Sequence, residues 1–109
     1  MNVDINGQNW VILEVDDKDD RLKIDDKECW GTCKYDVQHI YLCKQSLIGK
    51  KKQTLIHELS HAFVYEYLLK IQESYDNEEL CEFVAKYSER IVLIANKYFE
   101  VKYKYTKGC

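Results

Sequence analysis

The chain has 109 residues, of which 46% are hydrophobic and 32% charged, and its formal net charge is −3. A chain of this length can fill one hydrophobic core but not two, so we expect a single domain spanning residues 1–109. The acidic balance gives no general attraction for phosphate backbones, which argues against a nucleic-acid partner.

No targeting or membrane segment is evident in the sequence. The first residues have neither the basic start nor the apolar run of a secretory signal, and no stretch approaches 18 uninterrupted apolar residues. We therefore expect a cytoplasmic protein without a membrane partner. An odd number of cysteines and the lack of a C-x-x-C pair argue against a disulfide framework and a structural zinc finger (Cys29, Cys33, Cys43, Cys81 and Cys109).

The N-terminal part favours strands. The run W-V-I-L-E-V at 10–15 is rich in β-branched and aromatic residues and follows an N-G turn signal. The acidic stretch at 16–28 lacks the central glycine and closing glutamate of a calcium-binding loop, and we expect a solvated loop or short helical turn there. Runs at 29–33 and 39–43 flank a polar turn and predict a hairpin, with Ile40 and Leu42 on one face.

Two helices are predicted in the second half of the chain. Apolar residues recur at helical spacing over 47–70, where Ser46 or Gly49 could be the N-cap, and again over 78–99, where Asp76 or Asn77 could be the N-cap. A polar loop at 72–77 separates them. We therefore predict an α+β fold in which a small N-terminal antiparallel sheet or hairpin packs beside two long helices.

The stretch H-E-L-S-H at 57–61 lies in the first of these helices. Residues four apart stack on one helical face, so His57 and His61 can bind the same zinc ion from one rigid segment. Glu58 borders the same opening and could take a proton from a metal-bound water. This spacing is that of zinc peptidases.

The second predicted helix offers the third ligand of such a site. Glu78 and Glu82 are four residues apart and share a face, while Glu79 points elsewhere. If the helices are antiparallel, the start of the second lies near His61. Glu78 is then the first choice for the third ligand and Glu82 the second.

Other catalytic arrangements have less support. Ser60 is adjacent to His61, and neighbouring residues on a helix point about 100° apart, which argues against a serine hydrolase. We interpret Cys81 as a small buried residue and His39 as a surface or satisfied strand residue. An oxyanion donor could come from one of nine tyrosines, for example Tyr65, Tyr75 or Tyr87, and the sequence does not choose among them.

The pattern T-L-I-H-E-L-S-H-A-F followed by E-E-L-C-E-F-V-A resembles the ImmA/IrrE family of zinc metallopeptidases, small gluzincin-like proteins of bacteria, phages and mobile elements. The resemblance spans roughly residues 28–95. It implies a minimal zincin-like metallopeptidase core with Zn²⁺ as cofactor, His57, His61 and Glu78 as metal ligands, and Glu58 as general base. It also implies that the strand at 39–43 borders the groove in which an extended substrate binds.

We therefore expect a zinc-dependent metallo-endopeptidase that cleaves a protein or peptide substrate. Repressor-type transcription factors are the best-described targets of the family that the chain resembles. The alternative is a zinc-binding protein-interaction module with a zincin-like core and no turnover. A third possibility is that no metal binds and both histidines are ordinary helix residues. The sequence does not indicate the oligomeric state.

Overall fold

The computed structural model describes residues 1–103 of the chain. Six strands precede two long helices, with a short 3₁₀ helix after the second strand and a π-helical turn after the first long helix. In chain order the elements are β1 (Asn2–Ile5), β2 (Gln8–Val15), η1 (Asp20–Leu22), β3 (Lys23–Ile24), β4 (Lys27–Glu28), β5 (Gly31–Lys34), β6 (His39–Cys43), α1 (Ile48–Val64), η2 (Tyr65–Leu69) and α2 (Asn77–Tyr103).

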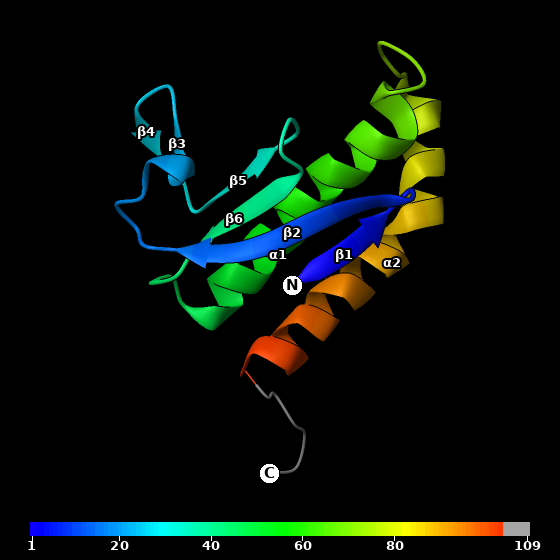
Figure 1. The fold of residues 1–109 in the computed structure, drawn as a ribbon. Coiled ribbons are helices and arrows are strands. Elements are labelled where there is room, and N and C mark those ends of the chain that lie inside the picture. The colour runs from blue at the N-terminus through cyan, green and yellow to red at the C-terminus, as the bar shows by residue number, and fades with distance from the viewer. Residues whose placement is uncertain (104–109) are drawn as a thin grey trace.

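Four strands form one sheet in the order β1-β2-β6-β5, while β3 and β4 form a separate two-stranded hairpin. The pairs β1–β2 and β5–β6 are antiparallel, whereas β2 and β6 run parallel, so the sheet is mixed. Figure 1 shows α1 crossing behind the sheet and α2 on the side of β1. Arg90 of α2 donates from Nη2 to the carbonyl of Asp4 at 3.0 Å, which ties that helix to β1.

A tight turn at Asn6 and Gly7 joins β1 to β2 and lets the two strands pair. Asn6 and Gly7 have φ of 52° and 79°, the left-handed pair that a two-residue hairpin turn requires. The Asn6 side chain then donates to the carbonyl of Glu66 at 3.0 Å. The first hairpin is thereby attached to η2 as well as to its neighbouring strand.

The two faces of the sheet pack against different groups. The larger core joins the sheet face containing Ile40 and Leu42 to both long helices. The core on the opposite face is smaller. There Leu22 of η1 packs on Tyr41 and Cys43. This alternation along β6 is the one expected from the period of two in a strand.

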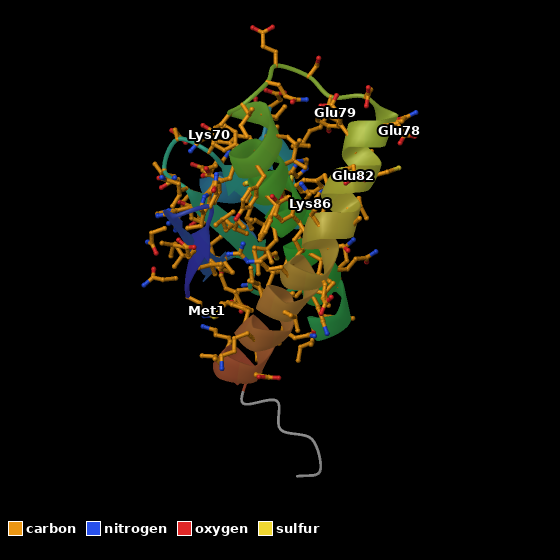
Figure 2. The ribbon with its side chains drawn as sticks, turned by 90° about the vertical axis from the view of Figure 1, so that its right-hand side faces the viewer. Met1, Lys70, Glu78, Glu79, Glu82 and Lys86 are labelled. Carbon is orange, nitrogen blue, oxygen red and sulfur yellow. The ribbon has the colours of Figure 1, made fainter. Side chains whose placement is uncertain are left out.

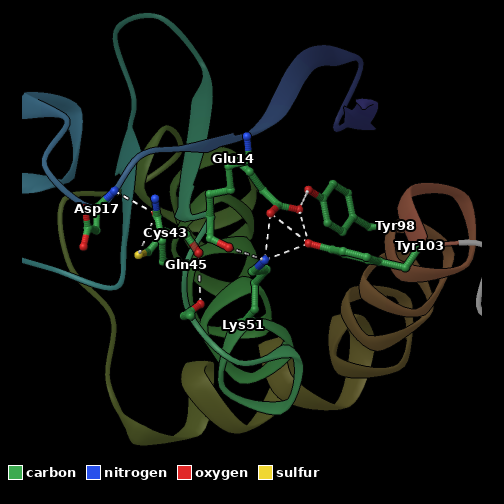
Figure 3. Close-up of polar contacts among 9 residues, drawn as sticks. Glu14, Asp17, Cys43, Gln45, Lys51, Tyr98 and Tyr103 are labelled. Atoms are coloured by element: carbon green, nitrogen blue, oxygen red, sulfur yellow. Dashed lines mark hydrogen bonds and ion pairs between the residues drawn. The ribbon is translucent and has the colours of Figure 1, made fainter.

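A buried polar cluster joins β2 to the ends of both helices (Figure 3). Glu14 accepts hydrogen bonds from Lys51 Nζ at 2.8 Å, from the Tyr98 hydroxyl at 2.6 Å and from the Tyr103 hydroxyl at 2.7 Å. Burial raises the pKa of Glu14, but these donors outweigh it and hold the pKa below its ordinary value. The cluster therefore fixes the start of α1 and the end of α2 to the sheet.

The fold confirms the α+β class and the order of a small sheet before two helices. The predicted strand at 10–15 lies within β2, the hairpin is β5–β6, and the predicted helix at 47–70 corresponds to α1 followed by η2. The expectation of an antiparallel sheet was wrong for the β2–β6 pair. Neither long helix of residues 1–103 has an apolar stretch of the length that a bilayer crossing needs.

The helix caps were predicted correctly for α2 but not for α1. At α2, Asp76 Oδ1 accepts from the Glu79 amide at 2.9 Å and Glu79 Oε1 accepts from the Asp76 amide at 3.2 Å, which is a capping box. At α1, the N-cap is Leu47, which has no side-chain acceptor, and the Ser46 hydroxyl donates instead to the Cys43 carbonyl.

Candidate functional site

The two motif histidines lie on one face of α1, as their spacing predicts. His57 Nε2 and His61 Nε2 are 3.2 Å apart, and the two rings are nearly perpendicular, with centroids 4.8 Å apart. The helix is continuous from Ile48 to Val64, so both side chains project from one rigid segment. Burial, and to a smaller degree His57, lower the pKa of His61, which favours its neutral form.

The spacing of these nitrogens fits a shared metal ion. Two imidazole nitrogens that bind tetrahedral zinc at about 2.0–2.1 Å are separated by roughly 3.3–3.4 Å. The observed 3.2 Å is close to this value. It is also a hydrogen-bond distance, so in the absence of metal one ring can donate a proton to the other. The lowered pKa of His61 suits both arrangements, because both need a nitrogen lone pair.

Glu58 lies next to the histidines in a different environment. Its side chain is buried although the two imidazoles are open to solvent, and no hydrogen-bond donor contributes to its pKa. Burial raises the pKa of Glu58, and the neighbouring His57 lowers it by less. A carboxylate with a raised pKa and free acceptor oxygens is suited to take up a proton.

Gly31 brings β5 against α1 at this point. A Cβ atom there would lie 2.5 Å from the Thr54 methyl, 3.1 Å from the Tyr41 carbonyl oxygen and 3.3 Å from Glu58 Cγ. Glycine is therefore needed for the close approach of strand and helix. Glu58 is held in the seam between them, and its charge helps to raise the pKa of Cys33 on β5 to about 12, after the larger effect of burial.

A groove of about 480 Å³ opens over this seam. The strand side is lined by Ile24, Cys29, Trp30 and Gly31. The helix side is lined by Lys50, Gln53, Thr54, His57, Glu58 and His61. The motif residues are thus brought together at one groove, between an edge strand and a helix.

The candidate third ligand lies elsewhere. Glu78 and Glu82 line a second cavity, of about 270 Å³, between α2 and η2, together with Tyr67, Phe83 and Lys86 among others. Figure 2 shows these glutamates on the first turns of α2. Within residues 1–103, no three histidine, cysteine, aspartate or glutamate side chains are close enough together to hold a metal ion. The structure therefore assembles the histidine pair but does not bring Glu78 or Glu82 to it.

The expectation that the strand at 39–43 borders the groove was wrong. The strand at 39–43 is β6, which lies inside the sheet and pairs with β2 on one side and β5 on the other. The edge strand is β5, and residues 29–31 at its start line the groove. The reason is the parallel β2–β6 pairing, which places β6 in the middle. His39 is remote from the site and its Nδ1 lies 2.8 Å from the Tyr41 hydroxyl.

Several secondary candidates can now be placed. Cys81 is exposed on α2, so its interpretation as a buried residue was wrong, and it does not line the groove. The suggested oxyanion donors, Tyr65, Tyr75 and Tyr87, do not line the groove either. Sequence analysis did not single out Tyr35, whose pKa is raised by burial and then by nearby charges that include Glu58. No spacing signal pointed to it, because it lies in the β5–β6 turn.

A comparison of the chain with known protein families, with curated proteins and with solved structures finds no match. A function can therefore be inferred only from the geometry of the groove and the motif within it.

Proposed function

We propose that the protein is a zinc-dependent metallo-endopeptidase that hydrolyses peptide bonds of a protein substrate, with Glu58 as general base. The observation that supports this most directly is the 3.2 Å separation of His57 Nε2 and His61 Nε2 beside the buried Glu58. Two converging imidazoles fit a zinc ion, and an adjacent carboxylate without hydrogen-bond donors fits a proton acceptor.

Each group in the groove has a chemical task in this proposal. Zinc, when bound, would acidify a water molecule and polarise the scissile carbonyl. Glu58 accepts the proton of the attacking water and passes it to the leaving amine, and its raised pKa moves it toward the pH at which both transfers are favourable. The open edge of β5 offers backbone groups to which an extended substrate can pair as a further strand.

The third zinc ligand in this proposal is Glu78, with Glu82 as the alternative. Both glutamates lie at the second cavity, so the first turns of α2 would have to approach His61 for either to reach the metal. Replacing each with glutamine separates the two candidates. Loss of the residue that binds zinc should lower the zinc affinity by more than the roughly 10- to 100-fold typical of residues that only support a ligand, and loss of the other should leave it unchanged.

The alternative function is a zinc-binding interaction module that holds a polypeptide in the groove without turnover. It is favoured by the fact that only two ligands converge within the described residues. The buried Glu58 favours the enzyme, because a purely structural site has no use for a carboxylate whose desolvation is unfavourable.

A cleavage assay with zinc-loaded protein and fluorescently labelled casein separates the two functions. The wild type should release labelled peptides, whereas Glu58→Gln should retain zinc and lose cleavage by at least 100-fold. Glu89→Gln, on the exposed surface of α2, is the matched control and should cleave like the wild type. Zinc-loaded wild type that binds casein without cutting it would reject the enzyme in favour of the interaction module.

A further inference from the structure

The mouth of the groove is lined by exposed apolar and polar side chains that have no role in the proposed hydrolysis. On the strand side, the side chains of Trp30 and Ile24 are 55% and 50% exposed, which is unusual for large apolar residues beside a groove of about 480 Å³. On the helix side, Lys50 and Gln53 are exposed. The groove mouth therefore has an apolar wall facing a wall of polar donors.

Trp30 is displayed from a fixed backbone. Its carbonyl accepts from the Cys43 amide at 2.9 Å, the Cys29 amide before it donates to the Leu22 carbonyl at 2.9 Å, and Gly31 after it packs on α1. An indole held this way offers a large apolar surface with little loss of backbone entropy on binding. Such rigid, exposed aromatic residues are common anchors at binding surfaces.

Among the residues 1–103 that line the groove, Lys50 is the one lysine or arginine. Its Nζ lies 5.9 Å from the centre of the Trp30 ring, which places the ammonium beside the apolar wall. The ion pairs formed among residues 1–103 do not involve Lys50. The one carboxylate that lines the groove is Glu58, which is buried at its base. Within the described part of the chain, the mouth is thus positive although the protein as a whole has a net charge of −3.

We propose that this mouth, formed by Ile24, Trp30, Lys50 and Gln53, is a specificity subsite for an extended polypeptide with an acidic side chain next to a large apolar one. The apolar side chain packs on Trp30 and Ile24, and the carboxylate pairs with the ammonium of Lys50. The choice of a polypeptide as the occupant rests on the proposed function, whereas the preference for an acidic residue rests on the charge of the mouth.

Binding can be measured without turnover in the full-length Glu58→Gln variant. The protein contains two tryptophans, and Trp10 is fully buried, so a ligand at the mouth changes the emission of Trp30 alone. The probes are three blocked octapeptides without tryptophan that differ only in the residue after a central leucine: glutamate, glutamine or lysine. Trp30→Phe supplies the reference emission of Trp10.

The glutamate peptide should bind about three- to fivefold more tightly than the glutamine peptide, which is the upper part of the range for an exposed ion pair, and more tightly still than the lysine peptide. Lys50→Glu should reverse this order. Lys52→Glu, on the same helix but outside the groove, is the control and should leave the order unchanged. Equal affinities, a preference that survives Lys50→Glu, or no change in Trp30 emission with any peptide would each overturn the subsite.

Incubating the zinc-loaded wild type with the same peptides keeps the two proposals apart. Binding of the glutamate peptide without cleavage would contradict the endopeptidase and retain the subsite. Cleavage of all three peptides at equal rates would support the endopeptidase and overturn the subsite.

Discussion

The side chains of Glu14 and Glu58 are both buried, yet their surroundings shift the pKa values of the two carboxyl groups in opposite directions. Glu14 accepts hydrogen bonds from Lys51, Tyr98 and Tyr103, and its pKa lies below the ordinary value. Glu58 has no such donor, and burial raises its pKa. The same residue type is therefore a structural anchor at one place and a candidate proton acceptor at the other.

The difference follows from what the second helix supplies. The end of α2 provides two hydroxyl groups to Glu14, whereas the wall opposite Glu58 is the backbone of β5 at Gly31. A buried ionised carboxylate without donors is unfavourable for folding. At Glu58 the neighbouring His57 offsets only part of the effect of burial, and no hydrogen-bond donor adds to it, which supports the proposed role of Glu58 as a proton acceptor in the groove.

We expect the largest loss of stability when the hydrogen-bonded cluster around Glu14 is broken. Lys51→Met leaves the Glu14 carboxylate buried without its cation, and we expect a loss of about 3–5 kcal/mol in the free energy of unfolding. Urea unfolding at neutral pH measures it. Lys52→Met, one residue along the helix, should change stability by less than about 1 kcal/mol. Equal effects of the two variants would show that the Glu14 cluster is not a structural anchor.

The seam beside Glu58 should be sensitive to added volume. Gly31→Ala places a methyl group 2.5 Å from the Thr54 methyl, and we expect a loss of about 1–3 kcal/mol in stability. Thr54→Ser removes that methyl group, so the double variant should recover part of the loss. Gly49→Ala, where no atom lies within 4 Å of the added carbon, is the matched control. A neutral Gly31→Ala would mean that β5 and α1 are not in close contact.

The hydrogen bonds that Glu14 accepts should make the stability of the fold depend on pH. Because the folded pKa of Glu14 is lowered, its contribution is present above the unfolded pKa near 4.5 and is lost as pH falls through the folded value. Tyr98→Phe removes one donor and should cost about 1–2 kcal/mol at neutral pH. The difference from wild type should shrink in acid, and urea midpoints measured across this range test it. A difference that stays constant with pH would contradict the assignment.

The contribution of Glu58 to the free energy of unfolding should change with pH in the opposite direction and by a smaller amount. Its folded pKa is raised, so its contribution is present below the unfolded pKa and is lost as pH rises through the folded value. In metal-free protein, Glu58→Gln should therefore stabilise the fold at neutral pH, by on the order of 1 kcal/mol, and the gain should vanish in acid. Thermal unfolding in the presence of a chelator measures it. A destabilised variant would place Glu58 among the structural anchors.

The sequence was enough to predict the longer regular elements and the grouping of His57, Glu58 and His61 on one helix. Periodicity was enough for α1, α2 and the β5–β6 hairpin, since their apolar residues recur clearly at 3.6 or 2 residues. It missed β1, which is only four residues long, and the two-residue strands β3 and β4 inside the expected loop. It also missed the parallel β2–β6 pairing, which depends on long-range contacts. His57, Glu58 and His61 come together because one helix holds all three, whereas the position of Glu78 depends on how two helices pack.

All of the proposed chemistry requires that the paired imidazoles of His57 and His61 bind one divalent metal ion. Calorimetric titration of the chelator-treated protein with zinc at neutral pH tests it directly. We predict one equivalent bound by the wild type, loss of that binding in His57→Ala and in His61→Ala, and no change in His39→Ala, which removes the histidine outside the groove. Absence of zinc binding in the wild type, or binding that survives the loss of either motif histidine, would contradict the claim.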